Sequence, residues 1–130
     1  TQKLASIAGP VLDVLDKGGV FVVDELDRSI HPELMERLVM LFHNHTLNKQ
    51  QAQLIFTSHN TNLLDAKILR RDQIVFVEKD AFGASKLYSL AEFKKDGKAT
   101  RNDENIEKNY LKGKYGALPM LGDFDNKLNR

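Results

Sequence analysis

Val20-Phe21-Val22-Val23-Asp24-Glu25 is the stretch that decides the fold of this chain. Its four consecutive apolar residues, three of them β-branched valines, predict a strand buried on both faces, as inside a parallel sheet. Because side chains alternate faces along a strand, the two carboxylates that end it cannot serve the same purpose. Ligands of open α/β sheets bind beyond the carboxyl ends of the strands, so Asp24 and Glu25 are candidate site residues. A solvated loop that happens to begin with Asp-Glu is the alternative.

The patterns on either side of this strand are helical. Residues 3–16 carry apolar side chains at helical spacing, and Gly9-Pro10 predicts a kink or break near residue 9, because proline lacks a backbone donor. Pro32 suits the first position of a second helix, which continues to about residue 44. This second helix is amphipathic, and we expect it to pack on a sheet.

A second apolar run, residues 53–59, ends in polar residues like the first. Strand, helix and strand in that order predict a right-handed parallel crossover. His59 should therefore emerge at the same edge of the sheet as Asp24 and Glu25. A short helix is expected to follow from Asn60 or Thr61.

The C-terminal half predicts a hairpin and a tail. Residues 74–78 and 86–90 read as strands, and the short connection between them contains Gly83, which favours an antiparallel pair. From residue 92 the chain turns polar and basic, with one helix expected over residues 103–112. The predicted fold class is α/β: a parallel sheet with flanking helices, a C-terminal β-hairpin and a helical tail.

Composition narrows the class of protein. A net charge of +1, from 19 basic and 18 acidic residues, gives no field that favours nucleic acid or an anionic membrane. The absence of cysteine excludes disulfides and thiolate metal sites and fits a cytoplasmic protein. No apolar run approaches the roughly 20 residues that span a bilayer, so we expect no membrane partner. Because Thr1 falls inside a helical pattern, we expect these 130 residues to be part of a longer protein.

The combination of Asp24-Glu25 on one strand and Ser58-His59 on the next resembles the C-terminal half of an ABC-class P-loop ATPase. The branch in question is shared by chromosome-maintenance, DNA-repair and bacterial anti-phage ATPases. In this resemblance Asp24 is the Walker B aspartate that serves Mg²⁺ through water. Glu25 is the catalytic glutamate, and His59 is the switch histidine that reaches the γ-phosphate of ATP.

Two further segments extend the resemblance. Ser29-Ile30-His31-Pro32 lies where the family has its D-loop, so Ser29 and His31 are implied to act across a subunit interface at the nucleotide. Thr1-Gln2-Lys3 looks like the end of the signature motif. The chain has no G-x-x-x-x-G-K-[ST] pattern, so the phosphate-binding loop is expected in an N-terminal half that precedes Thr1.

The resemblance implies a partial P-loop NTPase domain. Residues 1–91 would hold the Walker B, D-loop and switch-histidine part of the core, and residues 92–130 a basic helical tail of the same domain. ATP and Mg²⁺ are the implied cofactors of the intact protein, and its implied partners are the N-terminal half and a second, identical subunit. Because the phosphate-binding loop is lacking, we expect these 130 residues alone neither to bind nor to hydrolyse ATP.

The tail carries a second resemblance. Residues 110–119, Tyr-Leu-Lys-Gly-Lys-Tyr-Gly-Ala-Leu-Pro, are similar to the C-terminal segment of bacterial ATP-binding proteins of the abortive-infection type. This implies a role in anti-phage defence or DNA processing, with nucleic acid or a defence-system component as a partner. The tail itself could touch nucleic acid or dock on the domain.

Two other classes of protein stay open. The ATPase features could be vestigial in a binding or regulatory module. The chain could instead be a metal-dependent nuclease that uses Asp24, Glu25 and histidines. His43-Asn44-His45 spells a nuclease motif, but these residues fall at a helix end, where polar groups are favoured in any case. If part of the sheet lies elsewhere, the chain should also expose apolar surface and self-associate.

Overall fold

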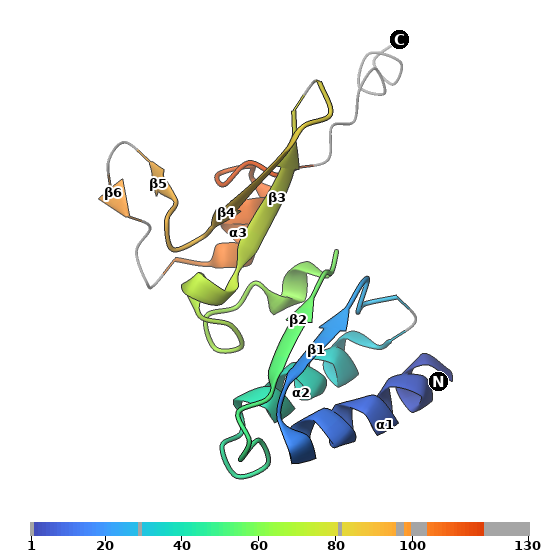
Figure 1. Ribbon diagram of the computed structural model, residues 1–130. Helices are drawn as coiled ribbons and strands as arrows, with labels where there is room; N and C mark the ends of the chain where they lie inside the picture. Colours follow the sequence, from blue (N-terminus) through green and yellow to red (C-terminus); the bar gives the residue numbers. More distant parts are fainter. Residues whose placement is uncertain (1, 29, 81, 96–97, 100–103, 119–130) are drawn as a thin grey trace. The chain divides into compact units, whose positions relative to one another are not determined.

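The computed structural model describes residues 2–28, 30–80, 82–95, 98–99 and 104–118 (Figure 1). Its contacts divide the chain into two compact units, Thr1–Leu63 and Leu64–Arg130. No helix in the described part is both long enough and apolar enough to cross a membrane. The assignment of residues 1–91 and 92–130 to ATPase core and tail stays a prediction, since compactness does not define a functional core.

The first unit is a parallel strand pair with two helices. β1 (Val20–Val23) pairs in parallel with β2 (Gln53–Phe56), and α2 (Pro32–His43) lies between them in the chain. The predicted parallel strand–helix–strand order is thus confirmed. α1 (Gln2–Lys17) contacts β1, α2 contacts β2, and the 3₁₀ turn η1 (Thr61–Leu63) follows where a short helix was expected.

Only one face of this sheet is covered, so the prediction that β1 is buried on both faces is wrong. Val20, Val22 and Ile55 are 53%, 68% and 56% exposed, while the residues that alternate with them are half-buried. Parallel sheets are ordinarily covered on both faces. Here α1 contacts β1 and α2 contacts β2, and among the described residues the exposed apolar side chains of the two strands leave the other face open to solvent. The expectation of exposed apolar surface is confirmed.

α1 runs without interruption through Pro10, so a break near residue 9 is wrong, while the alternative, a kink, stays a prediction. A proline in a helix interior costs about 3 kcal/mol. Burial of the apolar face offsets this cost. Val11 and Leu15 are only 3% and 6% exposed, and each buried aliphatic side chain stabilises the fold by about 1.5–3 kcal/mol. The apolar face therefore outweighs the cost of the proline.

α2 begins where the sequence predicts. His31 is the N-cap residue, and its Nδ1 accepts a hydrogen bond from the Glu33 backbone N–H at 3.3 Å. Pro32 takes the first helical position, where a missing N–H costs nothing. The helix ends at His43, and Asn44 then accepts the N–H groups of Thr46 and Leu47 through its Oδ1, at 2.9 and 3.2 Å.

Asn48 connects the end of α2 with the start of β2. It is 8% exposed, and its Nδ2 donates to the carbonyl oxygens of Phe42 and Ala52, both at 2.8 Å. Its Oδ1 accepts the Ala52 N–H at 2.7 Å. Because buried polar groups are costly unless they are paired, this one side chain specifies the connection between helix and strand.

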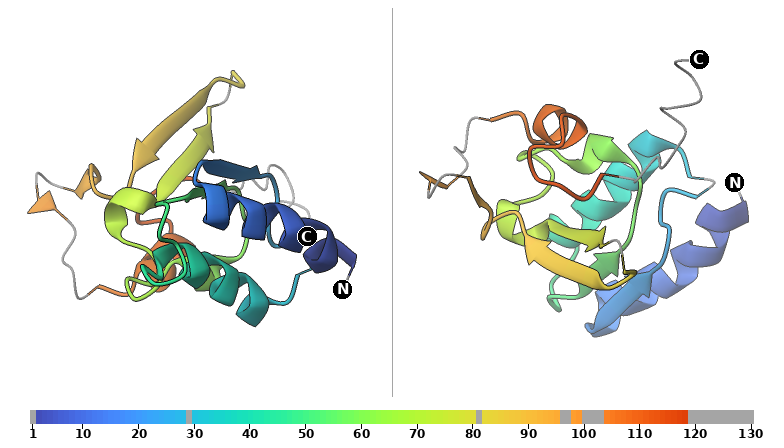
Figure 2. Two further views of the ribbon diagram at one scale, coloured as in Figure 1. Left: turned by 60° about the horizontal axis from the view of Figure 1, so that its bottom comes forward. Right: turned by 90° about the horizontal axis from the view of Figure 1, so that it is seen from above.

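The second unit is built on the predicted antiparallel hairpin. β3 (Val75–Lys79) and β4 (Ser85–Ser89) lie side by side in the ribbon (Figure 2). They pair with Val75 opposite Ser89 and Lys79 opposite Ser85. Asp80 Oδ1 accepts the N–H groups of Phe82 and Ala84 in the turn, each at 2.9 Å. Two short strands, β5 (Lys94–Lys95) and β6 (Lys98–Ala99), were not predicted.

An aromatic cluster around Phe76 joins this hairpin to the tail. The Phe76 ring stacks on those of Tyr110 and Tyr115, with centroids 5.5 and 5.6 Å away, and Tyr88 Oη donates to the Tyr115 carbonyl at 2.5 Å. α3 (Ile106–Leu111) forms within the predicted helical range, while residues 100–103 lie outside the described part. Tyr115 is 1% exposed, so the described part of the tail is docked. The buried residues of the cluster are Ile74, Phe76, Leu90, Ile106 and Tyr115.

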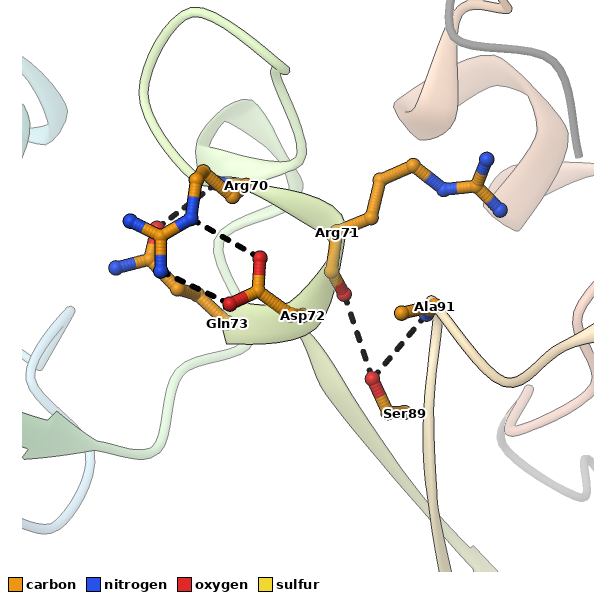
Figure 3. A network of polar contacts seen from close by, with 6 residues as sticks. All are labelled: Arg70, Arg71, Asp72, Gln73, Ser89 and Ala91. Atoms are coloured by element: carbon orange, nitrogen blue, oxygen red, sulfur yellow. Dashed lines mark hydrogen bonds and ion pairs between the residues drawn. The ribbon is translucent and has the colours of Figure 1, made fainter.

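The turn η2 (Arg71–Gln73) before β3 is tied to the end of β4 (Figure 3). Arg70 donates to both carboxylate oxygens of Asp72, at 3.1 and 2.9 Å, and this ion pair lowers the pKa of Asp72. Ser89 Oγ donates to the Arg71 carbonyl at 3.5 Å and accepts the Ala91 N–H at 3.1 Å. The two hydrogen bonds of Ser89 thus fix where the hairpin ends.

Candidate functional site

The candidate site lies in the first unit, where β1 and β2 end side by side. Pairing continues past both strands: the Thr57 N–H donates to the Val23 carbonyl at 3.1 Å, and the Leu26 N–H donates to the Thr57 carbonyl at 2.9 Å. Since Val23 is opposite Phe56 in the parallel register, the next residues of the two strands, Asp24 and Thr57, are neighbours. The carboxyl ends therefore meet at one edge, where sheet ligands bind.

The Thr57 hydroxyl joins the two candidate carboxylate residues. Its Oγ1 donates to Asp24 Oδ1 at 2.5 Å and accepts the Glu25 backbone N–H at 2.8 Å. The bond to Asp24 has the short length typical of a hydroxyl donating to a charged carboxylate. The side chains of Asp24 and Thr57 are exposed, so solvent reaches both.

Glu25 has an unusual backbone conformation. Its φ is +49°, in the left-handed region that costs a non-glycine residue roughly 1–2 kcal/mol. Its neighbour Leu26 is fully buried, which anchors the turn. The Glu25 side chain is 47% exposed, and its Oε2 lies 3.3 Å from Arg28 Nη1. The chain therefore reverses at Glu25 and leaves its carboxylate accessible at the edge of the sheet.

His59 follows β2 and is exposed. Its backbone N–H donates to Asp27 Oδ1 at 3.3 Å, which ties the loop after β2 to the loop after β1. The structure thus places Asp24, Glu25 and His59 at the ends of neighbouring parallel strands, the arrangement that the sequence predicts. Their catalytic and metal-binding roles stay predictions.

Of the two residues expected in the D-loop, Ser29 and His31, the structure describes only His31. Ser29 lies outside the described residues. His31 is exposed and uses Nδ1 to cap α2, as described above. That capping bond gives His31 a structural task independent of any contact between subunits.

Sequence reasoning missed two residues of the site, Thr57 and Asp27. A signal existed for Thr57, because aligning the two apolar runs in parallel places it directly opposite Asp24. No comparable signal exists for Asp27. Its bond to the His59 backbone depends on the turn at Glu25, and a left-handed residue there cannot be read from the sequence.

The donor chemistry fits Mg²⁺ held together with a nucleotide. Asp24 offers an exposed carboxylate, and Mg²⁺ usually takes one or two carboxylates, with waters and substrate phosphates completing its shell. Within the described ranges, no three or more histidine, cysteine, aspartate or glutamate residues are grouped so that they could hold a metal ion.

The N-terminal half of the chain matches a known protein family. The model of the family described as "AAA domain, putative AbiEii toxin, Type IV TA system" matches residues 1–65. This range is half of the 130 residues and contains Asp24, Glu25, Thr57 and His59. No curated protein and no solved structure is significantly similar to the chain.

Proposed function

Because the chain belongs to the AbiEii-type AAA family of the P-loop NTPase superfamily, we propose that it forms the Walker B part of an enzyme that binds and hydrolyses ATP. One observation carries the proposal above all. Two parallel strands end together, one with the adjacent carboxylates Asp24 and Glu25 and the other with His59, and Thr57 bonds the first strand end to the second. The finer assignment is the C-terminal half of an ABC-class ATPase.

Each side chain has a chemical task that its type suits. Mg²⁺, when bound with ATP, supplies positive charge to the phosphate oxygens, and Asp24 would hold it through water. Glu25 would orient the attacking water and accept its proton, an effect worth about 10²–10⁴-fold in rate. His59 would donate a hydrogen bond to the γ-phosphate, where charge develops during transfer.

The phosphate-binding loop would come from another part of the same protein. The 130 residues contain no G-x-x-x-x-G-K-[ST] pattern, while Val22 and Ile55 expose apolar side chains on the open face of the sheet. That open face is consistent with further strands or helices packing there. The proposed assembly is a homodimer, with Ser29 and His31 near the second subunit. Its proposed work is anti-phage defence or DNA processing, with a nucleic acid or defence-system partner.

Glu25→Gln in the full-length protein tests the proposal. The variant keeps the size of the side chain but removes the base, so we expect kcat to fall by about 100-fold or more. ATP-bound dimers should persist, which sedimentation with ATP would show. Glu33→Gln is the matched control, because Glu33 is an exposed glutamate in the first turn of α2. Wild-type hydrolysis by Glu25→Gln would refute the role of Glu25, and a full-length protein without ATP-dependent dimers would favour a vestigial module.

A further inference from the structure

Thr57 has no assigned role, yet its hydroxyl contacts both carboxylate residues of the site. A threonine hydroxyl has one proton and two lone pairs. The proton points to Asp24 Oδ1 at 2.5 Å, and the Glu25 backbone N–H occupies a lone pair at 2.8 Å. The hydroxyl therefore forms the middle of a directed chain from the Glu25 amide to the Asp24 carboxylate, and such chains strengthen each bond.

Packing does not explain a threonine at this position. Thr57 is exposed, so its methyl group contributes little to the core of the first unit. Its backbone completes the strand pairing through Val23 and Leu26, and any residue other than proline could make those backbone bonds. What a different side chain would remove is the hydroxyl, and with it the bonds to Asp24 and Glu25.

The two hydrogen bonds of the Thr57 hydroxyl restrain the carboxylate of Asp24 and the backbone of Glu25, and the proposed chemistry depends on the orientation of both. The bond to Oδ1 fixes the rotation of the Asp24 carboxylate and leaves Oδ2 free of this donor. The bond from the Glu25 N–H helps to hold a residue whose φ of +49° is unfavourable, and the backbone at Glu25 determines where its side chain points.

We infer that Thr57 is a positioning residue that orients Asp24 toward the metal and Glu25 toward the attacking water. The inference rests on the proposed function, because it assigns Thr57 to the same ATPase site. Thr57 touches neither nucleotide nor metal in this assignment and acts only through the two carboxylate residues. The loss of a residue that holds a metal ligand in place through a hydrogen bond typically lowers metal affinity or activity by about 10–100-fold.

Thr57→Val and Thr57→Ser in the full-length protein test the inference. Valine keeps the branched shape without the hydroxyl, whereas serine keeps the hydroxyl. We expect Thr57→Val to lower kcat and the affinity for Mn²⁺, measured by electron paramagnetic resonance with ATP present, by about 10–100-fold each. KM for metal-bound ATP should rise with the loss of metal affinity, because metal and nucleotide bind together. The affinity for ATP without metal should stay unchanged, because no contact to the nucleotide is lost. Thr57→Ser should restore most of both quantities.

The outcomes separate this inference from the proposed function. Wild-type kcat and Mn²⁺ affinity in Thr57→Val, or a Thr57→Ser variant as impaired as Thr57→Val, would overturn the role of Thr57. If Glu25→Gln is inactive in the same assays, the ATPase proposal survives that result. If Glu25→Gln hydrolyses ATP normally, the ATPase assignment itself fails. Thr57→Ala, which also lacks the hydroxyl, replaces Thr57→Val should the latter not fold.

Discussion

Asn48 is the residue whose replacement should most directly disturb the register of the parallel strands. Its side chain makes three hydrogen bonds within a buried environment, two to carbonyl oxygens and one from the Ala52 N–H. Each such bond contributes about 0.5–1.5 kcal/mol, so Asn48→Ala should lower the free energy of unfolding of the first unit by about 1.5–4.5 kcal/mol. Because Ala52 directly precedes β2, the same bonds determine where that strand begins and hence that Thr57 meets Asp24.

Amide hydrogen exchange measured by NMR is the suitable assay, because it reports the two compact units separately. In Asn48→Ala the protected amides of β1 and β2 should exchange about 10- to 2,000-fold faster, while those of β3 and β4 should keep their rates. Asn62→Ala is the matched control, since Asn62 is exposed in η1. A loss below about 0.5 kcal/mol, the range of ordinary surface substitutions, would refute the reasoning that Asn48 holds the start of β2.

Three further predictions concern the second unit, the open face of the sheet and nucleotide binding. The pKa of Tyr88 is raised by burial first and by the Glu78 charge second. The contribution of neutral Tyr88 to stability is therefore present below the ordinary tyrosine pKa and is lost as pH rises through the higher folded value. Ultraviolet titration should show Tyr88 ionising late, and Tyr88→Phe should remove that step. Val22→Thr keeps a β-branched residue on the open face of the sheet but makes that face less apolar. The 130-residue chain should therefore self-associate less in sedimentation. An unchanged association constant would show that self-association does not use this face. Calorimetry should detect no micromolar ATP binding by the 130 residues alone, and a clear binding isotherm would contradict the need for an external phosphate-binding loop.

The parts of the fold that depend on local pattern could be predicted from the sequence. The apolar runs that became β1 and β2, with the start of α2 at Pro32 between them, were enough for the parallel crossover. That crossover in turn brought Asp24, Glu25 and His59 to one edge. The hairpin of β3 and β4 followed equally well, because a short connection with Gly83 leaves few other ways to join two strands.

The structural predictions that were wrong share one physical cause, because in each of them tertiary packing overrides the local preference of the sequence. Pro10 predicts a kink or a break, but the helix is not broken, because burial of Val11 and Leu15 outweighs the cost of the proline. A run of valines predicts burial on both faces, but burial depends on what packs against the strand, and the run itself carries no such information. The hydrogen bond from the Glu25 N–H to Thr57 Oγ1 joins residues 32 positions apart, and a contact over such a separation cannot be read from a local pattern.

The parallel strand pair has a consequence for engineering. Among the described residues β1 and β2 pair only with each other, so each strand keeps one backbone edge open. An open edge can accept another strand through main-chain hydrogen bonds whatever polypeptide supplies it. Under the proposed function, a separately expressed piece that carries the phosphate-binding loop would pair with this chain in trans, as the two halves of a split enzyme. Recovery of the proposed ATPase activity on mixing would then report the encounter of two proteins fused to the halves.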